Sequence, residues 1–302
     1  MSSTNKRRKQ IEGWAGALTL RKIKRAIEKA SPERAEEIGA GLGRIIKRLS
    51  RKHRERANSN LKMAFPEWEE AKVQEVSNKV FEHFGMLATD FLAAPKRDVQ
   101  FILDNTEIIG MEHLEAALTQ KKGVLLVTGH FGNRERMAAY LGIKGVKLSV
   151  VARDADDEGV TGIMNGIRGH FGTQVISRGN AARPLLEKLR ANELVGILPD
   201  QNSNEVFIDF FGKPAGTVLG PGVLHERTKA PVIAVFCMRV APLKYRLTIY
   251  PELLGEQKEG YVKGEAIMRE FHALLEQEIR KYPEQWLWFH DRWRNARRKG
   301  LL

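Results

Sequence analysis

A histidine and a glutamate five positions apart are the residues whose types and spacing best suit acid–base chemistry. Residues 124–128 form a short apolar run that predicts a strand, and His130 follows two residues later. Asn133 is a good N-cap for a following helix, which places Glu135 in the first helical turn. A carboxylate against one imidazole nitrogen fixes the tautomer and leaves the other nitrogen free to take a proton from a hydroxyl. We therefore expect His130 to act as a general base and Glu135 to orient it.

The same spacing also fits a helix that is merely capped by Asn133, with an exposed histidine and a stabilising first-turn glutamate. On one continuous helix, positions five apart point roughly 140° away from each other. The two side chains can meet only because His130 is predicted to lie in a loop and Glu135 beyond the turn. On spacing alone, the catalytic and the structural interpretations fit equally well.

The composition indicates a chain with a sizeable core and an uneven charge. Of the 302 residues, 42% are hydrophobic, and the single cysteine, Cys237, excludes an internal disulfide and a cysteine-based zinc site. Cys237 lies in an apolar run and is expected to be a buried, inert thiol. Residues 1–60 hold 17 Lys/Arg and 6 Asp/Glu, so they carry +11 of the net charge of +13. This block predicts a polyanionic partner, either nucleic acid or an anionic membrane.

Helical periodicity dominates the first third of the chain. We interpret residues 1–10 as a disordered basic tail, residues 11–95 as a basic amphipathic helical annex that faces a membrane, and residues 96–302 as an α/β domain. Ser31 followed by proline predicts the start of a helix. No stretch approaches the ~18 consecutive apolar residues of a spanning helix, and no signal peptide is expected. An apolar stripe at helical spacing follows Ser31: Ile38, Leu42, Ile45, Ile46 and Leu49.

Short apolar runs alternate with helical patterns after residue 101. This alternation predicts an α/β fold with a largely parallel sheet flanked by helices. Ligands of such sheets bind at the carboxyl ends of the strands, which is where His130 is placed. The expected strands cover residues 123–128, 147–152, 174–177, 194–198, 232–238 and 246–250, and the expected helices 134–142, 157–170, 181–191, 219–229 and 261–281.

The segment His-Phe-Gly-Asn-Arg-Glu at 130–135 resembles the His-x4-Asp/Glu motif of the glycerolipid and lysophospholipid acyltransferases. It is more closely similar to the His-Phe-Gly-Asn-Trp-Glu block of the lipid A biosynthesis (lauroyl/myristoyl) acyltransferase family, with Arg134 in place of tryptophan. The resemblance covers about residues 35–298, whereas the N-terminus has a basic amphipathic segment where many members have a hydrophobic anchor. Further blocks match in order at 60–66, 151–153 with 167–168, 196–201, 210–217 and 282–288.

The resemblance implies further site residues. Arg168 would bind a phosphate of the donor or acceptor, because a guanidinium holds such oxygens with two hydrogen bonds. Asp200 ends an apolar strand and would orient Arg168 or the acceptor. A surface salt bridge for Arg168 and a turn or cap for Asp200 are the structural alternatives. Gly212 and Pro214 are expected to shape a loop rather than to touch substrate. Other implied substrate-binding residues are Asn133, Arg153 and Gln201.

The resemblance also implies a reaction and a location. An acyl chain would pass from an acyl-carrier-protein or coenzyme A thioester to a hydroxyl of a lipid A precursor or another glycolipid, such as a phosphatidylinositol mannoside. No metal and no cofactor are expected, and the enzyme would lie peripherally on the cytoplasmic face of the inner membrane. A basic nucleic-acid-binding protein is the alternative, which explains the N-terminal charge but not the ordered blocks.

Overall fold

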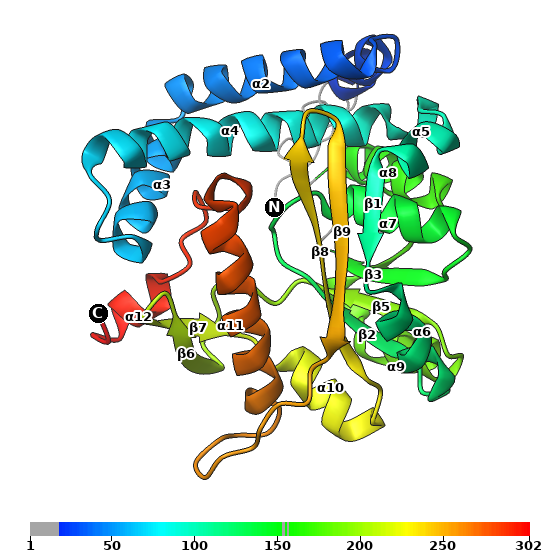
Figure 1. The fold of residues 1–302 in the computed structure, drawn as a ribbon, viewed down its shortest axis with the longest axis vertical. Helices are drawn as coiled ribbons and strands as arrows, with labels where there is room; N and C mark the ends of the chain where they lie inside the picture. Colours follow the sequence, from blue (N-terminus) through cyan, green and yellow to red (C-terminus); the bar gives the residue numbers. More distant parts are fainter. Residues whose placement is uncertain (1–17, 153–154, 156) are drawn as a thin grey trace, which may run out of the picture.

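A seven-stranded sheet forms the centre of the computed structural model, which describes residues 18–152, 155 and 157–302 (Figure 1). Its order is β1-β9-β8-β2-β5-β3-β4, and every neighbouring pair is parallel except the β8–β9 hairpin. This confirms the predicted α/β class with a largely parallel sheet. The strands are β1 (Thr106–Ile109), β2 (Val124–Val127), β3 (Leu148–Ala152), β4 (Gln174–Ser177), β5 (Leu194–Ile197), β8 (Val232–Ala241) and β9 (Lys244–Glu252).

Helices cover both faces of this sheet, and a further group of helices precedes it in the chain (Figure 1). The chain is helical at 18–28, and the short 3-10 turns are η1 (Ala94–Lys96), η2 (Arg178–Asn180) and η3 (Pro283–Gln285). The remaining helices are α2 (Pro32–Leu49), α3 (Arg51–Ala64), α4 (Glu70–Ala93), α5 (Val99–Asp104), α6 (Met111–Thr119), α7 (Arg134–Ile143), α8 (Glu158–His170), α9 (Ala182–Arg190), α10 (Gly220–Thr228), α11 (Glu265–Lys281) and α12 (Arg294–Arg298).

Side-chain alternation along the central strand β2 divides the core into two layers. Leu125 and Val127 pack in a cluster with residues of α9 and α11 and with three buried tryptophans near the C-terminus. Val124 and Leu126 pack on the other face, with residues of α6 and α7. Because all four residues of β2 are buried, the carboxyl end of this strand is held firmly between the two layers.

The helices α2, α3 and α4 are stacked on this core. Residues of α3 and α4, including Leu61 and Val80, belong to the same buried cluster as the sheet. Helix α2 lies on the side of α4 that faces away from the sheet (Figure 1). The two helices approach closely at Gly43, where an added Cβ would lie 2.1 Å from the carbonyl oxygen of Phe81. The predicted helix start is confirmed, since the Ser31 hydroxyl accepts a hydrogen bond from the backbone of the first turn.

Residues 210–217 form most of an antiparallel hairpin of β6 (Val206–Phe210) and β7 (Lys213–Thr217). Gly212 lies in the turn of this hairpin, as expected, whereas Pro214 belongs to β7 rather than to a loop. Phe211 and Gly212 have φ angles of 57° and 68°. Two consecutive positive φ values are typical of the tight two-residue turn that suits the twist of a hairpin. Among the described residues, no helix is both long enough and apolar enough to cross a membrane.

Candidate active site

The carboxyl ends of β2 and β5 bring His130 and Asp200 together. These strands are parallel neighbours, and Val127 is paired with Ile197. His130 and Asp200 each lie three residues beyond this pair. Since parallel strands end at the same edge of a sheet, equal spacing past paired residues places the two side chains side by side.

Three hydrogen bonds fix the Asp200 carboxylate. One oxygen lies 2.8 Å from Nδ1 of His130, and the other accepts from the His130 backbone N–H at 2.7 Å and from the Trp286 indole at 3.1 Å. Asp200 is only 2% exposed. Burial alone would raise its pKa, but the His130 ring and these donors outweigh burial and hold the pKa well below its usual range. An ionised Asp200 keeps the proton on Nδ1, which leaves Nε2 as the basic nitrogen.

Glu135 was expected to contact the His130 ring, but in the structure it is bound to Arg168 instead. Nε and Nη2 of Arg168 donate to the two carboxylate oxygens of Glu135 at 3.0 and 2.7 Å. Burial raises the pKa of Glu135, but the hydrogen bonds from Arg168 and the charge of Arg134 bring it below its ordinary value. The expectation that Glu135 contacts the imidazole is therefore wrong, and Asp200 occupies that position. Glu135 lies in the first turn of α7, as expected.

The loop between β2 and α7 depends on close backbone contacts. Gly132 has a φ of 60°, and an added Cβ would lie 2.2 Å from the carbonyl oxygen of Cys237. Its N–H donates to the Gln285 carbonyl at 3.0 Å, and the Asn133 N–H donates to the Cys237 carbonyl at 2.6 Å. Cys237 is a buried free thiol, as expected, and burial raises its pKa to about 12. Strand β8 and the C-terminal segment thus hold the His130 loop.

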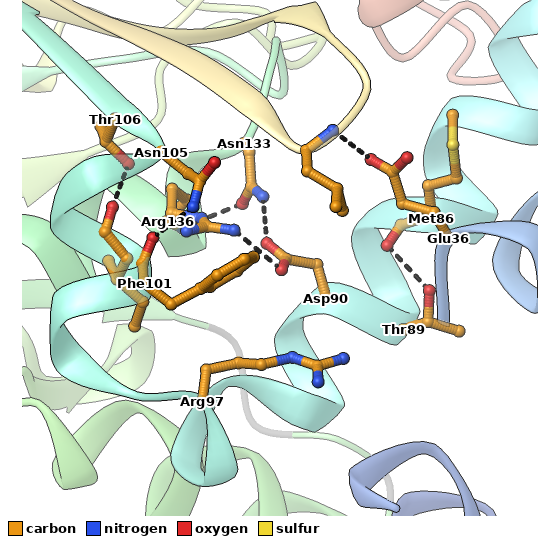
Figure 2. Close-up of polar contacts among 12 residues, drawn as sticks. Glu36, Met86, Thr89, Asp90, Arg97, Phe101, Asn105, Thr106, Asn133 and Arg136 are labelled. Carbon is orange, nitrogen blue, oxygen red and sulfur yellow. Dashed lines mark hydrogen bonds and ion pairs between the residues drawn. The ribbon is translucent and has the colours of Figure 1, made fainter. Parts of the chain in front are cut away.

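The N-terminus of α7 is tied to α4 through Asn133. The Asn133 side chain caps the helix by accepting from the Arg136 N–H at 2.9 Å, as the sequence predicts. Its amide group donates to Asp90 of α4 at 2.7 Å, and Arg136 donates to the same carboxylate at 3.1 Å (Figure 2). Asn133 is 2% exposed, so its polar atoms are used inside the protein.

A cleft with about 2180 Å³ of open space adjoins the His130–Asp200 pair. Arg134, Glu135, Arg168 and Gln201 line it together with His130. The Gln201 amide nitrogen lies 3.4 Å from Nε2 of the imidazole. Arg153 lies outside the described residues. The cleft also has an apolar part, which includes Val150, Val151, Val160, Met164, Ile197 and Val218.

Comparisons with known proteins identify the family of this chain. The pattern of the bacterial lipid A biosynthesis acyltransferase family matches residues 3–295. The chain belongs to this family. A lipid A biosynthesis acyltransferase of Haemophilus influenzae is 26% identical, over 84% of this chain and 79% of the relative. A lipid A biosynthesis lauroyltransferase of Escherichia coli is also 26% identical, over 85% and 84%. The predictions of the family and of an O-acyltransferase are confirmed.

Two residues near the C-terminus that no sequence pattern signals also support the His130–Asp200 pair. Trp286 donates to Asp200, and the His290 ring accepts from the Asn202 N–H at 3.1 Å, two residues after Asp200. Burial lowers the pKa of His290 to about 4, so the ring is neutral and able to accept. Trp286, Trp288 and Trp293 of the same segment are buried. No spacing in the sequence signals their contact with the strand ends.

Proposed function

We propose that this protein transfers a fatty acyl chain from a thioester of acyl carrier protein or coenzyme A to a hydroxyl of a lipid, with His130 as general base. The observation that carries the proposal is the buried Asp200 carboxylate on Nδ1 of His130, beside the open cleft. A paired carboxylate stabilises the imidazolium that forms when Nε2 takes up a proton.

The proposed reaction is a direct transfer. The acceptor hydroxyl gives its proton to Nε2 of His130 while its oxygen attacks the thioester carbonyl carbon. The carbon–sulfur bond breaks when the tetrahedral intermediate collapses, and the imidazolium returns the proton to the departing sulfur. No serine or cysteine stands in the 130–135 segment, so the proposal includes no acyl-enzyme.

The Glu135–Arg168 pair would bind a charged group of the substrate, such as a phosphate, in the same cleft. Both side chains line it, and the side chains are 18% and 15% exposed. Two nitrogens of the Arg168 guanidinium already donate to Glu135. A substrate phosphate at Arg168 would therefore either share these donors with Glu135 or replace Glu135 as their acceptor. This assigns the pair to donor or acceptor binding and leaves the orientation of the ring to Asp200.

We propose a lipid A precursor as the acceptor, supported by the names of two relatives that match 84% and 85% of this chain. Another glycolipid is the second candidate. A phosphatidylinositol mannoside acyltransferase of Mycobacterium tuberculosis is 26% identical, but the match covers 61% of this chain and 58% of the relative. Family membership favours either acceptor over the nucleic-acid-binding alternative.

Radiolabelled acyl-carrier-protein and coenzyme A thioesters, offered with a lipid A precursor or with total bacterial lipid, test the proposal. Mass spectrometry of the lipid product would identify the acceptor and the ester position. Transfer should fall ~10²–10⁴-fold or more in His130→Ala, because a general base is lost. His113→Ala, on helix α6 outside the cleft, is the control and should keep full activity. A folded His130→Ala protein with normal turnover would remove the general base from the mechanism.

The proposed function includes attachment to an anionic membrane through α2. The face of this helix that carries small residues is buried against α4, at Ala35, Gly39 and Gly43. Most of its large apolar side chains point outward, and Leu49 is 82% exposed. Exposed large apolar side chains on one helix face indicate a membrane or protein contact. The other exposed members of this stripe are Leu42, Ile45 and Ile46, whereas Ile38 is partly buried.

Charge favours a membrane as the partner of this stripe. Arg48, Arg51 and Lys52 are exposed next to Leu49 in the sequence, and each basic residue near an anionic bilayer contributes on the order of 1 kcal/mol. Lys47 does not belong to this exposed basic group, because it is buried and donates to Asn78 of α4 at 2.7 Å.

Co-sedimentation with vesicles of phosphatidylglycerol, compared with phosphatidylcholine vesicles across a salt series, tests the attachment. Leu49→Asn should weaken binding to the anionic vesicles. Leu254→Asn is the matched control, because Leu254 is 78% exposed but lies far from α2 in the sequence, after β9. Equal binding of both variants, or salt-sensitive binding of duplex DNA without binding of vesicles, would argue against the membrane.

A further inference from the structure

Arg134 brings to the active-site cleft a guanidinium that has no hydrogen-bond partner among the residues that the structure describes. It lies at the first position of α7, four residues after His130, and both side chains line the cleft. Its ion-pair partner is Glu135, with Nε of Arg134 3.7 Å from a carboxylate oxygen. This distance is longer than a hydrogen bond, so the N–H groups of the Arg134 side chain are free to bind another acceptor.

The carboxylate beside Arg134 is already bound by Arg168. Two nitrogens of Arg168 donate to Glu135 at 3.0 and 2.7 Å, and the shorter bond goes to the same oxygen that faces Arg134. One carboxylate therefore serves two guanidinium groups, which leaves one positive charge on this wall of the cleft without a counter-charge. The Arg134 side chain is 30% exposed, so an anion that enters the cleft can reach it.

We propose that Arg134 binds a phosphate group of the substrate and makes the enzyme selective for phosphorylated substrates. The inference rests on the proposed function and names the residue that recognises the charged part of its substrate. A guanidinium binds phosphate oxygens with two parallel hydrogen bonds. Arg168 can do so only at the expense of its bonds to Glu135, whereas Arg134 has no such bonds to give up.

The other charged residues of the described lining are less suited to this role. Glu205 is an anion, and both of its carboxylate oxygens accept hydrogen bonds from neighbouring loop residues. Arg178 follows β4, which is separated from β2 by β5 and β3 in the sheet. Since neighbouring strands lie ~4.8 Å apart, the end of β4 is roughly 14 Å from the end of β2. A phosphate close to the reacting atoms at His130 therefore meets Arg134 rather than Arg178.

Steady-state kinetics of two Arg134 variants test the proposal. Arg134→Met removes the charge and should raise the Michaelis constant of the phosphorylated substrate ~10–100-fold with little change in kcat, because a contact with a charged group is lost. Arg134→Lys keeps the charge without the planar fork and should lie between Arg134→Met and the wild type. Arg183→Met, on α9 outside the cleft and 90% exposed, is the matched control and should change neither constant. Melting temperatures establish that each variant is folded.

Removing the phosphate from one substrate at a time identifies its source. The acceptor arm compares a lipid A precursor with its dephosphorylated form, and the donor arm compares acyl-coenzyme A with the acyl-pantetheine thioester. Loss of the phosphate that Arg134 binds should raise the Michaelis constant of the wild type and have no further effect in Arg134→Met. We expect this result in the acceptor arm, because the long pantetheine arm of the donor keeps its phosphates away from the thioester. Equal effects of phosphate removal on the wild type and Arg134→Met, in both arms, would overturn the proposal.

Equilibrium dialysis with radiolabelled inorganic pyrophosphate separates the phosphate site from the reaction. Wild-type and Arg183→Met proteins should bind this probe alike, and Arg134→Met should bind it at least ~10-fold more weakly. If the wild-type protein shows this difference but transfers no acyl chain from any donor, the proposed function fails while the phosphate site stands. Equal binding of pyrophosphate to all three folded proteins refutes the inference even where acyl transfer is active.

Discussion

Replacing Asp200 by asparagine tests the central feature of the site. Asparagine has nearly the same volume and can still accept from the Trp286 indole. Its amide N–H would face Nδ1 of His130, however, at the position where the carboxylate now lies 2.8 Å away. The imidazole would then keep its proton on Nε2, which is the nitrogen that must take up the acceptor proton. The substitution should therefore leave the fold in place and remove the base.

The magnitude follows from the role of the carboxylate. In Ser-His-Asp triads, the same exchange lowers kcat by ~10⁴-fold because it selects the wrong tautomer. We expect a loss of 10³–10⁴-fold here, or about 4–5 kcal/mol of transition-state stabilisation. Asp200 is 2% exposed, and the aspartate of such triads is likewise buried and hydrogen-bonded to its histidine. The Michaelis constants should change little, since Asp200 does not line the cleft.

Steady-state kinetics with purified proteins measure the effect. Asp209→Asn in the β6–β7 hairpin, outside the cleft, controls for the exchange of a carboxylate for an amide. Circular dichroism and the melting temperature establish that each variant is folded. Glu135→Gln should mainly raise a Michaelis constant, because it loosens Arg168 but leaves the ring on Asp200. A folded Asp200→Asn protein with kcat within ~10-fold of the wild type, together with a collapsed kcat in Glu135→Gln, would refute the assignment of Asp200.

The other predictions concern the ion pair, the loop and acid stability. Arg168→Lys should lower kcat/KM ~10–100-fold, because lysine cannot make the two-fold hydrogen bond; unchanged kinetics at subsaturating substrate would return Arg168 to a structural role. Gly132→Ala should lower the melting temperature markedly, since its Cβ would meet the Cys237 carbonyl at 2.2 Å and φ is 60°; calorimetry showing an unchanged melting temperature would contradict the close contact. Burial lowers the pKa of His83 and of His272 to about 3 from 6.5, so between these values the unfolded chain binds more protons than the folded one. Stability should therefore fall as the pH falls from about 6.5 towards 3, and a flat melting temperature across that range would show that the two rings are not buried neutral.

Local signals in the sequence determined the elements and the family. The apolar runs and helical periodicities predict β4 at its observed bounds, and α7 to α10 within one residue or so at each end. Asn133 and Ser31 identify helix starts because capping depends on neighbours within one turn. The motif around His130 identifies the family because the motif blocks occur in a fixed order along the chain. The strand β1 and the β6–β7 hairpin escaped prediction, since β1 (Thr-Glu-Ile-Ile) is not a continuous apolar run and the hairpin depends on two positive φ angles in its turn.

The tertiary structure decided which carboxylate serves His130. Glu135 is five residues away in the chain and Asp200 is seventy, yet Asp200 is the partner, because β2 and β5 are neighbours in register and both end at the same edge of the sheet. Long-range packing also decides the order of the strands, the hydrogen bond from Trp286 to Asp200 and the outward direction of the apolar stripe on α2. No local pattern encodes them, because each arises from segments that meet only when the buried core has formed. The sequence therefore determined which groups are available for chemistry, and the pairing of strands determined which of them act together.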